Sequence, residues 1–236
     1  MQLTYLGHSA FRLDLAQSAI LIDPFLNGNS LFENCPVSYA DAMQGVTHIL
    51  LTHGHEDHVG DTVDIAQQTG ARVVCMVELA GLLEQAGVTT TTPYNLGGTY
   101  SNVDFSCTFV RADHSSSWQG QYAGVPAGLI VNVANGPQIY HMGDTALFPE
   151  MSDIHARFQP EIGLVPIGGQ FTMDSDTATI CCNRYFAFKE IVPIHYATFA
   201  GLETNPQPFM DATIAHGRTA LQPGASLSLQ DVARAA

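Results

Sequence analysis

The run HGHEDH at residues 53–58 is the feature that most constrains what this chain can fold into. Four of its six side chains, three imidazoles and the Asp57 carboxylate, bind metals in their usual ionisation states. An apolar, β-prone segment at residues 48–52 precedes the run, and an amphipathic stretch from Asp61 follows it. The run therefore lies at the C-terminal end of a strand, where the turn into a helix brings these side chains around one point. This pattern predicts the nucleus of a two-metal hydrolytic site.

The charge balance excludes one large class of partners. Only 8 residues are Lys or Arg, among them the single lysine Lys189, against 22 Asp or Glu, and the formal net charge is -14. Long-range attraction to an RNA or DNA backbone depends on a cationic field that this chain lacks. We therefore expect a small-molecule substrate and no nucleic-acid partner, although the metal chemistry itself would suit a nuclease.

Several features of the sequence point to one cytoplasmic domain. No stretch approaches the 18 or more apolar residues of a membrane span, and the opening MQLTYLGHSAF goes directly into a strand pattern without a basic region or a cleavage site. The five cysteines, including adjacent Cys181 and Cys182, show no CxxC spacing, which favours reduced core thiols. We expect a single domain over residues 1–236, a cytoplasmic location and no membrane partner, and leave a homo-oligomer open.

Hydrophobic periodicity divides the chain into two halves of similar content, each with strands first and then alternating strands and helices. Asp174 or Ser175 is the expected cap of a helix in the second half. Two sheets packed face to face with helices outside would accommodate this pattern. The predicted strands are 2–6, 10–15, 19–22, 48–52, 72–76, 103–111, 127–133, 138–142, 161–165, 190–194 and two short ones within 218–229 around Pro223-Gly224, and the predicted helices are 61–68, 78–85 and 176–188.

These motifs resemble those of the metallo-β-lactamase superfamily. HGHEDH matches its HxHxDH signature, and His114 in ADHSSS, Asp144 in HMGDT and His195 in PIHYATF match its third histidine, bridging aspartate and last histidine. With LGHSAF, IDPF and IGGQFTM, the resemblance covers nearly the whole chain. It is closest to the small single-domain metal-dependent hydrolases of the superfamily, distant relatives of the L-ascorbate-6-phosphate lactonases. The resemblance implies an α/β fold, the four-layer αβ/βα metallo-β-lactamase sandwich.

The resemblance also implies two divalent metal ions, with zinc as the first choice and manganese or iron as alternatives. A water between two such ions would be held as hydroxide at neutral pH, and Asp57 would orient it and help to move its proton. The implied ligands are His53, His55 and His114 for one metal, Asp57, His58 and His195 for the other, and Asp144 as the bridge.

Four further positions have both a structural and a functional interpretation. Asp23 is either a turn aspartate or a carboxylate that orients the metal-binding loop through hydrogen bonds. His8 follows Gly7 at a strand end and could bind substrate, donate a proton or be structural. Gly168 and Gly169 could form an anion-binding nest or a plain turn. The isolated histidines His48, His141, His155 and His216 are interpreted as structural or surface residues.

Three functions are compatible with the sequence. The leading one is a hydrolase of a small ester, lactone or phosphodiester. A sugar-phosphate lactonase would need cationic contacts, for which Arg12, Arg111 and Arg184 are the candidates. A metal-binding or regulatory scaffold without turnover is the third. Candidate residues for an apolar mouth of the site are Phe25, Phe32, Trp118, Tyr122 and Phe171, and the candidate active-site loops are Asn27–Tyr39 and Ser115–Gly124.

Overall fold

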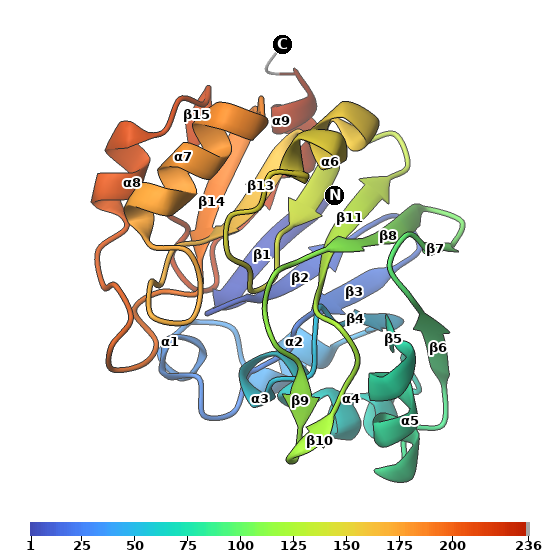
Figure 1. Ribbon diagram of the computed structural model, residues 1–236. Coiled ribbons are helices and arrows are strands. Elements are labelled where there is room, and N and C mark those ends of the chain that lie inside the picture. The colour runs from blue at the N-terminus through green and yellow to red at the C-terminus, as the bar shows by residue number, and fades with distance from the viewer. Residues whose placement is uncertain (235–236) are drawn as a thin grey trace.

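The computed structural model of the chain describes residues 1–234, and in it two mixed β-sheets lie between two layers of helices (Figure 1). Each sheet has seven strands, and a separate two-stranded hairpin is formed by β9 (Ser117–Trp118) and β10 (Gln121–Tyr122). This is the predicted α/β architecture of four layers.

The first sheet has the strand order β16-β1-β2-β3-β4-β5-β6. Its first strands pair antiparallel, whereas β3 to β6 run parallel, because a helical segment or a long crossover connects each of these strands to the next. Its strands are β1 (Gln2–Gly7), β2 (Ala10–Asp14), β3 (Ala19–Ile22), β4 (His48–Leu50), β5 (Arg72–Met76), β6 (Thr91–Tyr94) and β16 (Ser226–Ser228).

The second sheet repeats this plan with the order β15-β14-β13-β12-β11-β8-β7. Again an antiparallel set, β7, β8, β11 and β12, continues into a parallel set, β12 to β15. The repetition confirms the two similar halves expected from the sequence. The strands are β7 (Thr99–Ser101), β8 (Phe105–Arg111), β11 (Ala127–Val133), β12 (Gln138–His141), β13 (Ile162–Pro166), β14 (Glu190–Ile194) and β15 (Gly217–Arg218).

Alternation along the strands builds the two cores. In β11, Leu129 and Val131 point into the cluster shared with the first sheet, while Ile130 between them joins the cluster under the helices on the other face. The larger cluster draws buried side chains from both sheets, so the sheets are held together by apolar contacts. That residues 1–236 form a single domain stays a prediction, and residues 235 and 236 lie outside the described part.

Helices cover the outer faces of both sheets (Figure 1). α4 (Thr62–Thr69) and α5 (Val77–Gln85) pack on the first sheet, and α6 (Met151–Phe158), α7 (Ser175–Tyr185) and α8 (Gln207–Ala212) lie over the second. The short helices α1 (Ser30–Glu33), α2 (Tyr39–Met43), α3 (Glu56–Val59) and α9 (Leu229–Arg234) complete the chain. Among the described residues no helix is long and apolar enough to cross a membrane.

The structure departs from the sequence-based expectation in several elements. α7 ends at Tyr185 rather than residue 188, because Phe186 is extended and its ring stacks on that of Phe188 at 4.7 Å. The elements that were not predicted are the helices α1, α2, α6, α8 and α9 and the strands β6, β7, β9 and β10. Of the two short strands expected within residues 218–229, β16 lies inside that range, whereas β15 overlaps it only at Arg218. The two strands belong to different sheets, because β15 pairs with β14 and β16 pairs with β1.

Candidate metal centre

The HGHEDH run follows β4 as a tight turn into α3. His55 is the N-cap residue of α3, so Asp57 and His58 lie in the first turn and face back toward the strand end. Gly54 is required in this turn, because a Cβ there would collide with Ala123. The N–H of Gly54 also donates to Ser116 Oγ at 3.1 Å. The turn is thereby fixed against the loop after β8.

The second sheet contributes the other three predicted ligands from its own strand ends. His114 follows β8, Asp144 follows β12 and His195 follows β14. His195 has a left-handed backbone with φ 55°, and its N–H donates to the carbonyl of His8, in the turn between β1 and β2, at 2.9 Å. The seven predicted ligands therefore meet where the ends of both sheets come together.

Three imidazoles form one group of potential ligands. His55 Nδ1 lies 3.0 Å from His53 Nε2 and 3.3 Å from His114 Nε2. Their ligand atoms all lie within 4.8 Å of one another, which is close enough for one ion to reach all three.

A second group combines a carboxylate with imidazoles. Asp57 Oδ2 lies 3.7 Å from His195 Nε2 and 3.1 Å from His8 Nε2, and His58 belongs to the same group. The grouping places His8 beside the three ligands expected from the sequence.

Asp144 lies between the two groups. Its Oδ2 is 3.0 Å from His195 Nε2, 3.5 Å from His114 Nε2 and 4.0 Å from His53 Nε2, while its Oδ1 is 3.2 Å from His58 Nε2. The side chain is only 2% exposed. This position is the one that a bridging carboxylate would occupy.

The donor set fits divalent cations. His58 Nε2 and Asp144 Oδ1 are buried and have no hydrogen-bond partner of suitable geometry among the described residues. Such buried polar atoms are costly unless another group satisfies them. Nitrogen and carboxylate donors converging at this point are the usual ligands of zinc and related metals.

A hydrogen-bonded chain behind the site determines which imidazole nitrogens face it. The fully buried Asp23 accepts from Thr52 Oγ1 at 2.7 Å and lies 2.7 Å from His58 Nδ1. Because the Thr52 hydroxyl donates to Asp23, its oxygen can accept from His53 Nδ1 at 3.0 Å. Both histidines then present an unprotonated Nε2 to the site, which is the arrangement that metal-ligating histidines require.

In the absence of metal, nearby carboxylates determine which histidines of the site hold a proton. Burial lowers the pKa of His53 well below its ordinary value, and the neighbouring His58 lowers it further. Burial also lowers the pKa of His195, but Asp144 and Asp57 outweigh it and bring the value to about 9. His58 behaves similarly, since Asp144 and Asp23 overcome burial and raise its pKa well above the usual range. Cations would compete with these protons for the same nitrogens.

His8 is fully buried and does not line the pocket in front of the centre. Its Nδ1 lies 3.0 Å from Thr198 Oγ1 and its Nε2 3.1 Å from Asp57 Oδ2. Burial lowers the pKa of His8 to about 4, so the ring is neutral at pH 7 and donates through one nitrogen only. Direct contact with substrate, one of the roles considered from the sequence, does not match this location.

Gly168 and Gly169 affect the site through the backbone that supports it. A Cβ at Gly168 would overlap the carbonyl oxygen of His195, so the glycine allows the close approach of the His195 loop. The N–H of Gly169 donates to the carbonyl of Met173 at 3.0 Å and is used within its own turn. Of the two interpretations considered from the sequence, the plain turn describes Gly169.

Three supporting residues were missed by the sequence analysis or assigned elsewhere. Thr52 and Thr198 hold histidines of the site, as described above. His141, interpreted from the sequence as structural, is buried and joins Ser9 O at 2.9 Å to the N–H of Gly143 at 3.0 Å, so it holds the turn that carries Asp144. Its place in the buried strand β12 was the only sequence signal for this role.

The Beta-lactamase superfamily domain family matches residues 18–196, which include all seven predicted ligands. The chain belongs to the metallo-β-lactamase superfamily. A metal-dependent hydrolase of Brucella anthropi is 46% identical over 93% of this chain and 94% of its own, and one of Brucella ovis is 45% identical over the same shares. A metallo hydrolase from Ignicoccus hospitalis has a similar structure, with a TM-score of 0.83 and 31% identity over 96% of this chain and 97% of its own. The chain is thus a member of the metal-dependent hydrolases of this superfamily.

Proposed function

We propose that the protein hydrolyses a small ester, lactone or phosphodiester at a centre of two divalent cations. The position of Asp144 carries this proposal, because one buried carboxylate lies within 4.0 Å of four imidazole nitrogens contributed by both sheets. The residues that would hold the cations are His53, His55 and His114 on one side, Asp57, His58 and His195 on the other, and Asp144 between them.

The residues of the centre divide the work between binding and proton transfer. Bound cations would supply a water that is deprotonated near neutral pH and would polarise the oxygen of the scissile bond. Asp57 is the more exposed of the two central carboxylates, at 26% against 2% for Asp144. It can therefore orient a water at the pocket surface and accept its proton, whereas Asp144 is suited to holding cations.

Zinc is the metal that we propose first. Five of the seven proposed ligands are imidazoles, and neutral imidazole with carboxylate is a common zinc environment. Manganese and iron are the alternatives, since both accept nitrogen and oxygen donors.

The sugar-phosphate alternative lacks support from the arginines that it would require. Arg12 donates to Asp14 and to carbonyls at the end of α2, and Arg184 stacks on Tyr185. Arg111 is paired with two carboxylates away from the pocket. A scaffold without turnover remains the alternative from another functional class.

A cytoplasmic location with a small-molecule substrate is also part of the proposal. Each of the five cysteines is a free thiol, and four of them are buried, which suits a reducing compartment. The net charge of -14 opposes binding to nucleic acid, and we propose no nucleic-acid or membrane partner. A homo-oligomer stays open.

Metal analysis and a substrate panel test the proposal together. We expect two equivalents of metal per chain in the wild type, and turnover of an ester, a lactone or a phosphodiester but not of a structured RNA. Asp57→Asn should fold normally and lose on the order of 10²-fold or more in turnover, because it removes both a ligand and the proton acceptor. Asp14→Asn, at a partly exposed site on β2, is the matched control and should behave as wild type. A metal-loaded protein that turns over nothing in the panel would support the scaffold, and unchanged activity of Asp57→Asn would refute the assigned role.

A further inference from the structure

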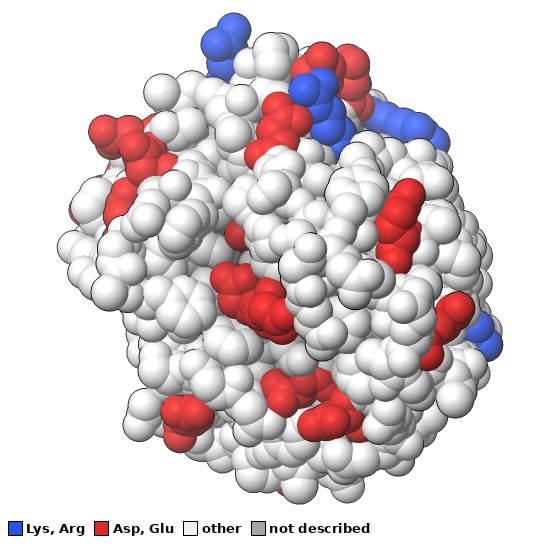
Figure 2. Space-filling model, turned by 60° about the horizontal axis from the view of Figure 1, so that its bottom comes forward, with Lys and Arg blue, Asp and Glu red and all other residues white. Residues whose placement is uncertain are grey.

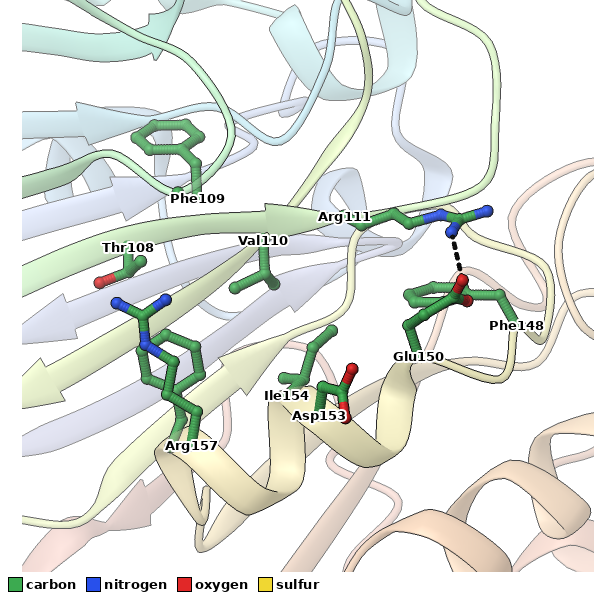
Figure 3. A pocket seen from close by; sticks show the side chains of 11 residues that line it. Thr108, Phe109, Val110, Arg111, Phe148, Glu150, Asp153, Ile154 and Arg157 are labelled. Atoms are coloured by element: carbon green, nitrogen blue, oxygen red, sulfur yellow. Dashed lines mark ion pairs between the residues drawn. The ribbon is translucent and has the colours of Figure 1, made fainter.

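A second pocket lies on the outer face of the second sheet, between β8 and α6 (Figure 3). We call it the β8–α6 pocket. Its walls come from β8, from the turn before β7 and from α6 with the loop that leads into it. Its volume is about 220 Å³, which suits a molecule smaller than the ligands that fill pockets of roughly 300–1,000 Å³.

The β8–α6 pocket is separate from the proposed metal centre. It shares no lining residue with the pocket in front of that centre, which is lined by five proposed ligands together with Ser115 and Phe171. Of the other residues expected at an apolar mouth there, Phe32 and Trp118 are buried instead. The proposed hydrolase function therefore assigns no role to the β8–α6 pocket.

Alternation along β8 gives this pocket an apolar floor. Val110 points to the helix side of the sheet and belongs to one cluster with Ile154 and Phe148, whereas the ring of Phe109 points the other way (Figure 3). Val110 and Ile154 are 8% and 7% exposed, and both line the pocket. Gly97, in the turn before β7, has no side chain to fill the space above them. A short apolar group would find contact area on this floor.

Cationic side chains are scarce on this protein, yet two of its eight lysines and arginines line the β8–α6 pocket. In Figure 2, acidic side chains occupy the middle of the view, while lysine and arginine side chains lie along its upper and right-hand margins. One of the two cations at the pocket, Arg111, is already engaged. Its guanidinium pairs with Glu150 at 3.1 Å and with Asp113 at 2.7 Å, and it lies over the ring of Phe148.

The second cation, Arg157, has no such partner. Figure 3 shows its guanidinium reaching from α6 toward Thr108, at the end of the pocket opposite Arg111. Asp153 lies on α6 between these two ends. Neither Arg157 nor Asp153 forms a side-chain hydrogen bond or an ion pair within residues 1–234, although their spacing of four residues on the helix would permit one. The pocket thus presents one unpaired cation and one unpaired carboxylate above an apolar floor.

These two charges select the class of ligand. An anion would be attracted by Arg157 but repelled by Asp153, and for a cation the reverse holds. A molecule with both a carboxylate and an ammonium can form a charge-assisted hydrogen bond with each of them. Its orientation is also set, because Arg111 with its two carboxylate partners leaves one formal negative charge at the other end, which favours the ammonium there.

We propose that the β8–α6 pocket binds an α-amino acid with an apolar side chain. Its carboxylate pairs with Arg157, its ammonium pairs with Asp153, and its side chain packs on Val110 and Ile154. The binding involves no covalent step and no metal, and it goes beyond the proposed hydrolase function.

Calorimetric titration of the metal-loaded protein with L-leucine tests the proposal against three analogues that each lack one group. 4-Methylpentanoate lacks the ammonium, 3-methylbutylamine lacks the carboxylate, and glycine lacks the apolar side chain. We expect leucine to bind with a Kd of about 1 mM or lower, and each analogue to bind about 10-fold or more weakly. If either singly charged analogue bound as tightly as leucine, or if leucine did not bind, the proposal would be overturned.

Variants locate the binding. Arg157→Gln and Asp153→Asn each remove one charge from an exposed side chain, so both should fold as wild type and bind leucine about 10-fold more weakly. Arg184→Gln is the matched control and should keep wild-type affinity, because Arg184 also lies over the ring of the following residue, Tyr185, but on α7 away from the pocket. Leucine bound through cations at the metal centre would be unaffected by all three substitutions. Unchanged affinity in Arg157→Gln and Asp153→Asn therefore overturns the assignment of this pocket.

Discussion

At the scale of single residues, the site depends on groups that never touch a ligand. Asp23 holds His58, and Thr52 connects Asp23 to His53, so one buried carboxylate orients two proposed ligands. Asp23→Asn keeps the size of the side chain but replaces an acceptor by a donor opposite His58. We expect zinc affinity to fall by about 10- to 100-fold, as measured by competition with a chromophoric chelator. If Asp23→Asn bound zinc as tightly as the control Asp14→Asn, Asp23 would only shape the turn.

Thr198 and His8 provide a second residue-scale test. Thr198 Oγ1 lies 3.0 Å from His8 Nδ1 and 3.1 Å from the carbonyl oxygen of Tyr196, and its one hydrogen can be donated to only one of them. When the hydrogen is donated to Nδ1, the neutral His8 ring donates through Nε2 to Asp57. Thr198→Val is nearly isosteric and removes the hydroxyl, so His8 and Asp57 should become less well oriented and turnover should fall by about 10-fold. Thr198→Ser keeps the hydroxyl and should keep the activity. The visible spectrum of the cobalt-substituted protein should change in the valine variant alone, and identical spectra would rule out a role in orienting Asp57.

The difference between predicted and unpredicted site residues has a physical reason. The proposed ligands occur in short motifs at strand ends, where residue type and position together predict metal binding. Thr198 contacts His8 across 190 positions of sequence, and no local pattern marks such a pair. Positions such as Asp23, which precedes a proline after a buried strand, could be singled out without deciding between a turn and a supporting role.

At the scale of elements, the turn after β13 sets the position of the loop that follows β14. Gly168→Ala would force its Cβ against the carbonyl oxygen of His195, which belongs to the backbone and cannot move alone. We expect a loss of about 1–3 kcal/mol in the free energy of unfolding together with weaker metal binding. Gly81→Ala is the control, because a Cβ in α5 meets nothing within 4 Å and should stabilise the helix by about 0.5–1 kcal/mol. Urea unfolding of both variants measures the difference, and equal stabilities would contradict the steric argument.

The start of α7 was predicted correctly from a local capping signal. α7 was expected with a cap at Asp174 or Ser175, and Asp174 indeed accepts from the N–H of Thr177 at 2.8 Å. α6 has no side-chain cap at Glu150, but α4 and α5 lack one as well and were predicted from hydrophobic periodicity, so a missing cap alone does not explain why α6 was missed. The end of α7 was placed too late because tertiary contacts of Phe186 override local helix preference.

At the scale of the whole molecule, the proposed centre joins the two sheets, and removing its cations should expose a dependence of stability on pH. Without cations, His195 holds a proton with a pKa of about 9, raised from 6.5. The protonated form stabilises the fold fully below about pH 6.5, and this contribution is lost as the pH rises through 9. Chelator-treated protein should therefore become less stable between these values.

Urea unfolding at pH 6.5 and pH 9 measures this effect. Metal-loaded protein should lack the loss, because a cation at His195 replaces the proton, and metal binding should release protons in calorimetry with two buffers. His195→Gln in the metal-free state is the control and should have a flatter dependence. If the stability of metal-loaded and chelator-treated protein changed with pH in the same way, the argument that a cation and a proton compete for the same nitrogen of His195 would be contradicted.

The architecture as a whole could be predicted because the same strand and helix pattern occurs twice, which favours two stacked sheets over one. That the two C-terminal strands β15 and β16 belong to different sheets could not be predicted, because a three-residue strand such as Ser226–Ser228 carries too little pattern to reveal its partner. Its pairing with β1 depends on where the finished first sheet leaves an edge open.

That pairing has a consequence for synthesis of the protein. Residues 226–228 leave the ribosome long after β1, with which they pair at Gln2 to Thr4. Until they arrive, the outer edge of β1 presents free N–H and C=O groups, which invite pairing with a neighbouring nascent chain. The outer edge of β1 therefore stays open to such pairing after both sheets are largely made, until this short strand covers it.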